Sequence, residues 1–234
     1  MFKLSSGPLL IGHSLRCGET RTKEAFLDSL LMNARTFWRR AVDQGQEYRQ
    51  LANGQWPQAL VISCSDSRVI PALITSARPG DLFELRNAGN IVPPHDAPSA
   101  SGEVATIEYA VGVLEVRNIV VCGHSHCGAV GAVVRGEDLS ALPGVNGWLD
   151  LARPGLEGVP GRPPRDRALL EFVQRHVVAQ LRNLSAYPMV KREVEAGRLK
   201  LHGWVYQVDT GELKELDEHG EFRSRNVWST PGEE

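Results

Sequence analysis

The sequence predicts an α/β fold in which a mostly parallel central sheet is flanked by helices and ends in an antiparallel C-terminal strand. Short runs rich in β-branched residues, which are typical of buried strands, occupy residues 59–63, 82–85 and 116–122. Segments with helical spacing of apolar residues lie between and after these runs, so neighbouring strands are expected to be parallel. Near the end of the chain, Gly211-Glu212 indicates a hairpin into residues 213–216, which would add a strand of opposite direction.

In the first half of the chain, the predicted elements begin with a long helix over residues 22–52. Its apolar side chains recur at spacings of three and four, and Thr22 is suited to cap its N-terminus. The strand at 59–63 is followed by a helix at 71–77, a turn at 79–81 and the strand at 82–85. Residues 86–98 are rich in Asn, Gly and Pro and are predicted to form a loop, after which a helix extends from 101 or 102 to 114.

The second half begins with the strand at 116–122 and a helix at 127–135. Residues 143–164 contain many Gly and Pro, and 153–164 are predicted to be an exposed loop. Helices at 165–184 and 190–196 precede a strand at 199–208 and the hairpin. Because the residues after 217 are polar, we expect them to be loosely held. No linker is evident, so the expected organisation is an N-terminal arm at 1–21, one α/β catalytic domain at 22–217 and a polar tail at 218–234.

Composition excludes several classes of partner. The chain of 234 residues can bury a sizeable core, and its net charge of −2 gives no footprint for nucleic acid or an anionic membrane. No apolar run reaches the roughly 20 residues that a membrane helix needs, and the N-terminus lacks signal-peptide architecture. We therefore expect a cytoplasmic location. There, a disulfide framework among Cys17, Cys64, Cys122 and Cys127 is disfavoured, and metal or catalytic use of thiols is favoured.

Two segments at the ends of predicted strands carry the chemistry. Cys64 follows the strand at 59–63, and His124 and Cys127 follow the strand at 116–122. Each signal is weak alone, since buried free cysteine is a common core residue. Together they are stronger, because the carboxyl ends of parallel strands meet at one edge of a sheet. Two thiolates and an imidazole suit zinc and leave a fourth position open, as in catalytic sites. Cys122 lies inside its strand and is predicted to be core.

Asp66 and Arg68 stand beside the first of these cysteines. They could form an ordinary surface ion pair, which would contribute little. Alternatively, Arg68 holds Asp66 by a two-pronged contact. Asp66 could then accept a hydrogen bond from zinc-bound water or hydroxide, or could itself occupy the fourth zinc position. Adjacency to Cys64 favours a functional pair.

Several short motifs occur in an order and spacing that resemble a β-class carbonic anhydrase of the plant-like type. They are CSDSRV at 64–69, PGDLF at 79–83, RNAGN at 86–90, EYAV at 108–111, CGHSHCG at 122–128, LHGW at 201–204 and GEL at 211–213. The resemblance runs from the helix at residue 22 to about residue 217. It implies reversible hydration of carbon dioxide to bicarbonate and a proton by zinc-bound hydroxide. It also implies one zinc per chain, held by Cys64, His124 and Cys127, with Asp66 and Arg68 as a catalytic dyad.

The same resemblance implies a substrate pocket, with one residue supplied across a dimer interface. Its members would be Gln55, Phe83, Ala88, Tyr109 and Gly128, of which Gln55 comes from the neighbouring subunit. Ordinary packing would also explain these positions, for Ala88 almost equally well. Proton transfer by His126 or His95 is left open.

The predicted assembly is a homodimer or a dimer of dimers. The apolar residues Phe26, Phe37 and Trp38 would be poorly covered on a lone subunit. The resemblance also bears on regulation. Some family members bind inhibitory bicarbonate at a second site that contains a tryptophan three residues before the first cysteine ligand. Val61 stands there in this chain, so we expect no such inhibition.

Three competing functions remain. The same scaffold could hydrolyse carbon disulfide or carbonyl sulfide, which the zinc site alone does not distinguish. A binding module with a structural zinc would need a fourth Cys or His at ligand spacing, and neither motif is expected to supply one. A redox thiol protein is disfavoured because the chain has no Cys-x-x-Cys pair.

Overall fold

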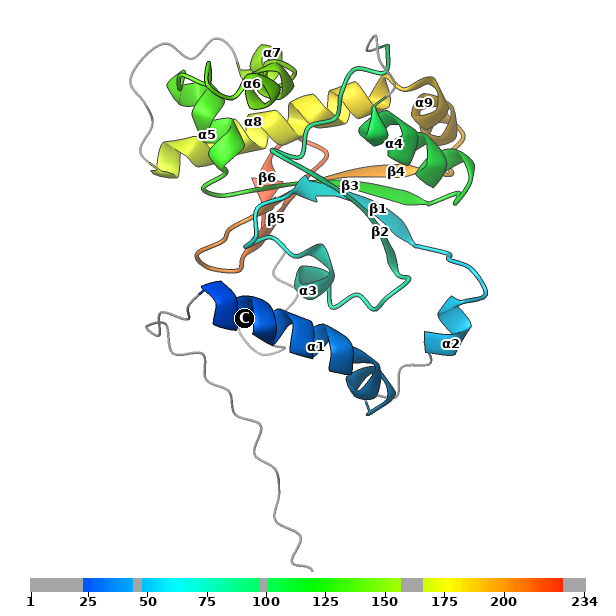
Figure 1. Ribbon diagram of the computed structural model, residues 1–234. Coiled ribbons are helices and arrows are strands. Elements are labelled where there is room, and N and C mark those ends of the chain that lie inside the picture. Colours follow the sequence, from blue (N-terminus) through cyan, green and yellow to red (C-terminus); the bar gives the residue numbers. More distant parts are fainter. Residues whose placement is uncertain (1–22, 44–47, 97–100, 157–165, 225–234) are drawn as a thin grey trace, which may run out of the picture. The chain divides into compact units, whose positions relative to one another are not determined.

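The computed structural model describes residues 23–43, 48–96, 101–156 and 166–224 (Figure 1). It divides into two compact units, residues 1–53 and 54–234, which are described separately. In the first unit, α1 spans Lys23–Asp43 and α2 spans Tyr48–Leu51. The sequence analysis predicted one helix over 22–52, and residues 22 and 44–47 of that range lie outside the described residues. Phe37 and Tyr48 join the two helices by an edge-to-face contact with ring centroids 5.7 Å apart.

The second unit is built around a sheet of strand order β2-β1-β3-β4-β5-β6 (Figure 1). The strands are β1 Ala59–Cys64, β2 Leu82–Asn87, β3 Asn118–His124, β4 Lys200–Tyr206, β5 Leu213–Leu216 and β6 Phe222–Arg223. The β1–β2, β1–β3 and β3–β4 pairs are parallel, whereas β4–β5 and β5–β6 are antiparallel. The predicted fold class is therefore confirmed.

The strand β6 lies in the segment that the sequence analysis expected to be loosely held, and that expectation is wrong here. The turn into β6 is closed by a hydrogen bond from Asp217 N to Glu221 O of 2.9 Å. Phe222 then packs against the main hydrophobic core. One aromatic side chain in a polar stretch is enough to add a short edge strand, because its partner β5 is already in place.

Helices cover both faces of the sheet in this unit. One face carries α4 Gly102–Gly112, α5 Gly128–Arg135, α6 Pro143–Asp150, α7 Arg153–Leu156, α8 Asp166–Ser185 and α9 Pro188–Glu195, and the other carries α3 Pro71–Thr75 (Figure 1). The long helix α8 lies closest to β3, where Gly123 leaves room for it. A Cβ at Gly123 would lie 2.7 Å from Val177. The predicted strands and helices correspond to observed elements apart from the differences noted here, with ends that differ by a few residues.

The segment predicted to be an exposed loop over 153–164 is in part helical. Arg153–Leu156 forms α7, and the side chain of Leu156 is buried. A Cβ at Gly155 would lie 2.6 Å from the Cβ of Ala179, so glycine here permits a close approach of α7 to α8. Residues 157–164 lie outside the described residues. The composition was misleading because Gly155 serves helix packing here and Pro154 stands in the first turn of α7, where proline is tolerated.

Alternation along the strands separates the core into two faces. Ile62, Ile119 and Val121 belong to the main core beneath the helical layer. Val61, Val120 and Cys122 form a second cluster on the opposite face. Cys122 is thus a core residue, as the sequence predicted. None of the helices among the described residues combines the length and apolarity that crossing a membrane requires.

Candidate metal centre

Neighbouring strands bring three potential ligands to the carboxyl edge of the sheet. Cys64 is the last residue of β1, His124 is the last residue of β3, and Cys127 directly precedes α5. All three side chains are buried, and their sulfur and nitrogen atoms lie within 4.8 Å of one another. Parallel pairing of β1 with β3 explains the convergence, since it places both strand ends on the same side. The sequence analysis predicted this convergence from the strand-end motifs alone.

The imidazole of His124 is oriented for a metal ion. Its Nδ1 lies 2.9 Å from the carbonyl oxygen of Ser125, which only accepts, so Nδ1 carries the proton and donates it. The other ring nitrogen, Nε2, is buried and has no hydrogen-bond partner among the described residues. A buried acceptor without a partner is costly, and a metal ion would satisfy it. Metal-binding histidines generally donate their second ring N–H in this way.

The two sulfur atoms complete a donor set that fits zinc. A hydrogen bond from the Cys127 thiol lowers the pKa of Cys64 to about 4, assisted by the backbone N–H of Gly89. The Gly89 nitrogen is 3.3 Å from the Cys64 sulfur. The pKa of Cys127 is raised, first by its hydrogen bond to Cys64 and then by burial. A metal ion bound by both sulfur atoms would displace the protons that they carry.

Asp66 and Arg68 form a bidentate ion pair beside this centre. Arg68 Nε donates to Asp66 Oδ1 at 2.9 Å, and Arg68 Nη2 donates to Oδ2 at 2.7 Å. These hydrogen bonds hold the pKa of the Asp66 carboxyl well below its usual range. Asp66 Oδ2 also lies 3.9 Å from His124 Nε2, so the carboxylate borders the metal centre. The two-pronged contact that the sequence analysis suggested for Arg68 and Asp66 is therefore present.

Arg86 is a positioning residue that the sequence analysis did not identify. Its Nη2 donates to the carbonyl oxygens of Cys64 at 3.0 Å, Asp66 at 3.0 Å and Val69 at 2.6 Å. One guanidinium thus holds the backbone that carries a predicted ligand and the carboxylate. The available signal was its place in the RNAGN motif, which begins in the last two residues of β2 at the same sheet edge.

An aromatic contact joins two of the predicted pocket residues, and the other three are described singly by their surroundings. Phe83 of β2 and Tyr109 of α4 lie together, with ring centroids 6.0 Å apart. Ala88 accepts a hydrogen bond through its carbonyl, 2.8 Å from Trp148 Nε1. Gly128 begins α5 with no neighbouring atom within 4 Å of where a Cβ would stand. Gln55 is exposed on the single chain.

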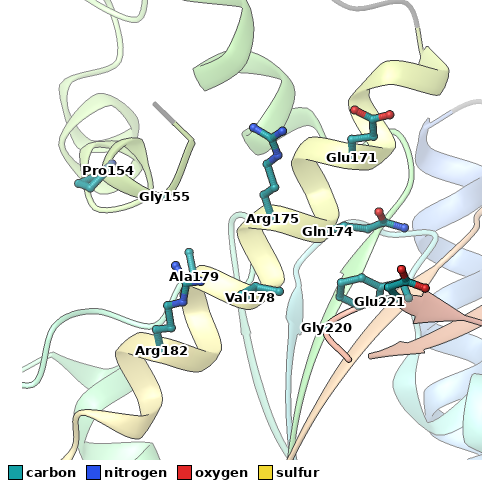
Figure 2. A pocket seen from close by; sticks show the side chains of 11 residues that line it. Pro154, Gly155, Glu171, Gln174, Arg175, Val178, Ala179, Arg182, Gly220 and Glu221 are labelled. Carbon is teal, nitrogen blue, oxygen red and sulfur yellow. The ribbon is translucent and has the colours of Figure 1, made fainter. Parts of the chain in front are cut away.

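A separate cavity of about 730 Å³ lies between α7, α8 and the turn before β6 (Figure 2). Acidic and basic side chains both line it, among them Glu171 and Arg175 of α8 and Glu221 of the turn. None of the predicted site residues is among its lining residues. This mixed surface indicates no particular ligand.

Comparison with known proteins connects the metal centre to a family. A sequence model of the family described as Carbonic anhydrase matches residues 59–213. A carbonic anhydrase of Pseudomonas aeruginosa is 45% identical over 202 residues, which cover 81% of this chain and 90% of that protein. The matched segment contains the three clustered side chains and the Asp66–Arg68 pair.

Solved structures show the same relationship. The β-carbonic anhydrase CcaA matches with a TM-score of 0.78 and 36% identity, covering 86% of this chain and 100% of that chain. One of two tetrameric β-carbonic anhydrases from Sordaria macrospora matches with a TM-score of 0.69 and 28% identity, covering 86% and 100%. The likeness thus extends over most of the chain.

Proposed function

The chain belongs to the β-class carbonic anhydrases, and we propose that it catalyses the reversible hydration of carbon dioxide to bicarbonate and a proton. One observation carries the proposal. A buried cluster of two cysteines and a histidine lies next to a bidentate Asp66–Arg68 pair, within the segment that the family model matches. One zinc ion per chain would be held by Cys64, His124 Nε2 and Cys127, which leaves a fourth position for the reacting molecule.

Zinc bound there would act as a Lewis acid and lower the pKa of a water molecule that it coordinates. Asp66 would accept a hydrogen bond from the attacking water and so direct a lone pair toward the carbon of the substrate. Arg68 keeps this carboxylate ionised and oriented through the two hydrogen bonds. Because the pKa of Asp66 is lowered, its carboxylate is an acceptor at neutral pH and a poor carrier of the released proton.

The remaining side chains would select and admit the substrate. Carbon dioxide carries no charge and offers only weak hydrogen-bond acceptors, so an apolar slot suits it. Phe83 and Tyr109 would supply that slot, and Gln55 would enter from a neighbouring subunit. The exposed aromatic side chains of α1 support an oligomer, with Phe26, Phe37 and Trp38 between 48% and 63% exposed on the single chain. The Sordaria macrospora relative is described as tetrameric. A cytoplasmic location stays a prediction.

The arrangement around Arg86 supports an enzyme without inhibition by bicarbonate at a second site. Its guanidinium is engaged by the carbonyls of the loop after β1. Val61 is buried in the second core cluster, where it provides no polar group for an anion. Asp66 is paired with Arg68, which leaves the fourth zinc position open.

Stopped-flow measurement of carbon dioxide hydration across pH, on protein of measured zinc content, tests the proposal. A rate that rises in proportion to zinc content supports it, and a fully loaded protein without hydration activity contradicts it. A parallel assay on carbon disulfide distinguishes the related hydrolase. Sedimentation at assay concentrations tests the assembly, and a fully active monomer at nanomolar concentration would exclude the role of Gln55 across an interface.

A further inference from the structure

The segment at residues 88–93, between β2 and α4, has no regular secondary structure, yet side chains hold its backbone at successive positions. Trp148 of α6 donates to the Ala88 carbonyl at 2.8 Å, and Tyr187 donates to the Pro93 carbonyl at 2.9 Å. Asn87 brackets the middle of the segment, donating to Ile91 O at 2.9 Å and accepting from Ile91 N at 2.8 Å. Movement of this loop would break one or more of these hydrogen bonds, most of which are buried.

The strongest part of this anchoring comes from two polar residues of α8, His176 and Gln180. Each is 1% exposed, and the mechanism proposed above uses neither. His176 Nε2 donates to the Gly89 carbonyl at 2.7 Å. Gln180 Nε2 donates to His176 Nδ1 at 3.4 Å, and Gln180 Oε1 accepts from Val92 N at 2.8 Å. A single neutral tautomer of His176 satisfies every one of these contacts. Burial lowers the pKa of His176, which agrees with that neutral form.

The same peptide segment contacts the metal centre. The backbone nitrogen of Gly89 lies 3.3 Å from the sulfur of Cys64. Gly89 has a φ of +87°, and a Cβ there would lie 2.9 Å from the Cβ of Ala129. Only glycine therefore allows the loop to approach α5 in this conformation and to aim its N–H at the sulfur. The carbonyl of Gly89 is held by His176 while its N–H faces Cys64.

We propose that His176 and Gln180 are positioning residues for the metal centre, which hold the N–H of Gly89 against the sulfur of Cys64. An N–H donor there stabilises the charge of the metal-binding thiolate and lowers the energy of the sulfur lone pairs, so its loss should weaken metal binding and lower the energy of charge transfer from sulfur to the metal. The inference rests on the proposed function, because it requires Cys64 to be a metal ligand. It adds a connection from the core helix α8 to the reactivity of the metal.

Substitution at His176 with a matched rescue tests the proposal. His176→Leu removes the donor but keeps an apolar side chain of similar size, and His176→Gln restores a donor near the position of Nε2. Leu169→Ala, a buried change on the same helix, controls for general destabilisation. Zinc affinity is measured by chelator competition on purified protein, and the cobalt-substituted proteins report sulfur-to-metal charge-transfer absorption.

We expect His176→Leu to bind zinc about tenfold more weakly and to shift the charge-transfer band to lower energy. His176→Gln should recover most of the zinc affinity and of the charge-transfer energy. Leu169→Ala should lower the melting temperature and change neither. Unchanged affinity and spectrum in His176→Leu would overturn the proposal. So would equal losses of zinc affinity in His176→Leu and Leu169→Ala.

A measurement on the unaltered protein covers the case in which His176→Leu does not fold. With zinc replaced by NMR-active cadmium, the amide proton of Gly89 should show scalar coupling to the metal through the Cys64 sulfur. Absence of that coupling, with the amide resonance resolved, would contradict the proposal. Cys64→Ser separates the two levels of inference. If Cys64→Ser keeps wild-type metal affinity, the ligand assignment fails, whereas if it loses the metal and the His176 variants behave as the parent, only the positioning role fails.

Discussion

Cys122 and Cys64 lie on adjacent parallel strands, one in the interior of the sheet and one at its carboxyl edge. Their surroundings shift the pKa values of the two thiols in opposite directions. Cys122 pairs in register with Ser63, one position before Cys64. In the interior, burial among apolar side chains raises the pKa of Cys122 to about 12. At the edge, hydrogen bonds led by the one from Cys127 lower the pKa of Cys64 to about 4. One step along a strand thus separates an inert thiol from a candidate metal ligand.

This contrast shows what the carboxyl edge provides. At the end of a parallel sheet, the connecting loops supply backbone donors, a second thiol and an imidazole that the interior lacks. Both cysteines are buried, at 6% exposure for Cys64 and 4% for Cys122, so burial alone does not distinguish them. The surroundings decide the role, and the following predictions test the difference.

The largest effect is expected from replacing the two cysteines separately. Cys64→Ser should lose most of its zinc and its hydration activity, because serine is a poor ligand for zinc. Cys122→Ala should keep one zinc per chain and show a loss of thermal stability only. Metal analysis and stopped-flow rates distinguish the two variants. Full zinc occupancy with normal rates in Cys64→Ser would remove the distinction between edge and interior.

The next effect concerns the carboxylate at the same edge. Asp66→Asn should retain zinc but hydrate carbon dioxide at least about tenfold more slowly, a barrier increase of about 1.4 kcal/mol. Asparagine is a weaker acceptor and carries no charge to form an ion pair with Arg68. Asp150→Asn is the matched control, since Asp150 forms an exposed ion pair with Arg153. A rate within about twofold of the parent, equivalent to about 0.4 kcal/mol, would make Asp66 structural.

A smaller effect is expected from bicarbonate. Val61 is packed with Cys122 in the interior cluster, and Arg86 is occupied by backbone carbonyls. Neither position is therefore expected to bind an anion that favours a closed state, and the population should not shift. Titration of bicarbonate at fixed pH should give simple hyperbolic product inhibition. Cooperative inhibition, with a Hill coefficient well above one, would contradict this expectation.

The smallest effect is a pH dependence of stability at the Asp66–Arg68 pair. The folded-state pKa of the Asp66 carboxyl lies below the usual carboxyl value of about 3.9. The stabilisation is therefore fully present above that value and is lost as pH falls through the folded pKa. The stability difference between the parent and Asp66→Asn, measured by urea unfolding, should be constant between about pH 5 and 8 and shrink below about pH 4. A difference that changes near neutral pH would indicate another titrating group.

The sequence predicted the parts that depend on local pattern. Alternating strands and helices indicated the α/β class, and the apolar run before Cys64 corresponds to β1. The same reasoning placed Cys122 in the core. It was wrong for Arg153–Leu156 and for the residues of β6, because Gly and polar residues there serve packing against α8 and pairing with β5.

The loop at residues 88–93 shows the limit of prediction from local sequence. Its composition predicts an irregular segment, which is correct, but suggests nothing about how firmly the segment is held. His176 and Gln180 look like ordinary members of an amphipathic helix in sequence. Their partners, Gly89 and Val92, are 87 and 88 positions away along the chain.

The sequence by itself determined which chemistry is available, because the end of a strand and the residues that follow it can be located from neighbouring positions alone. It therefore indicated two thiols, one imidazole and an Asp–Arg pair at a sheet edge. Only the tertiary structure decided which atoms meet. The engagement of Arg86 by the carbonyls of Cys64 and the following loop, and the placement of the Gly89 N–H, depend on contacts between separate segments of the chain. Such contacts arise from packing of the whole core, which no local pattern encodes.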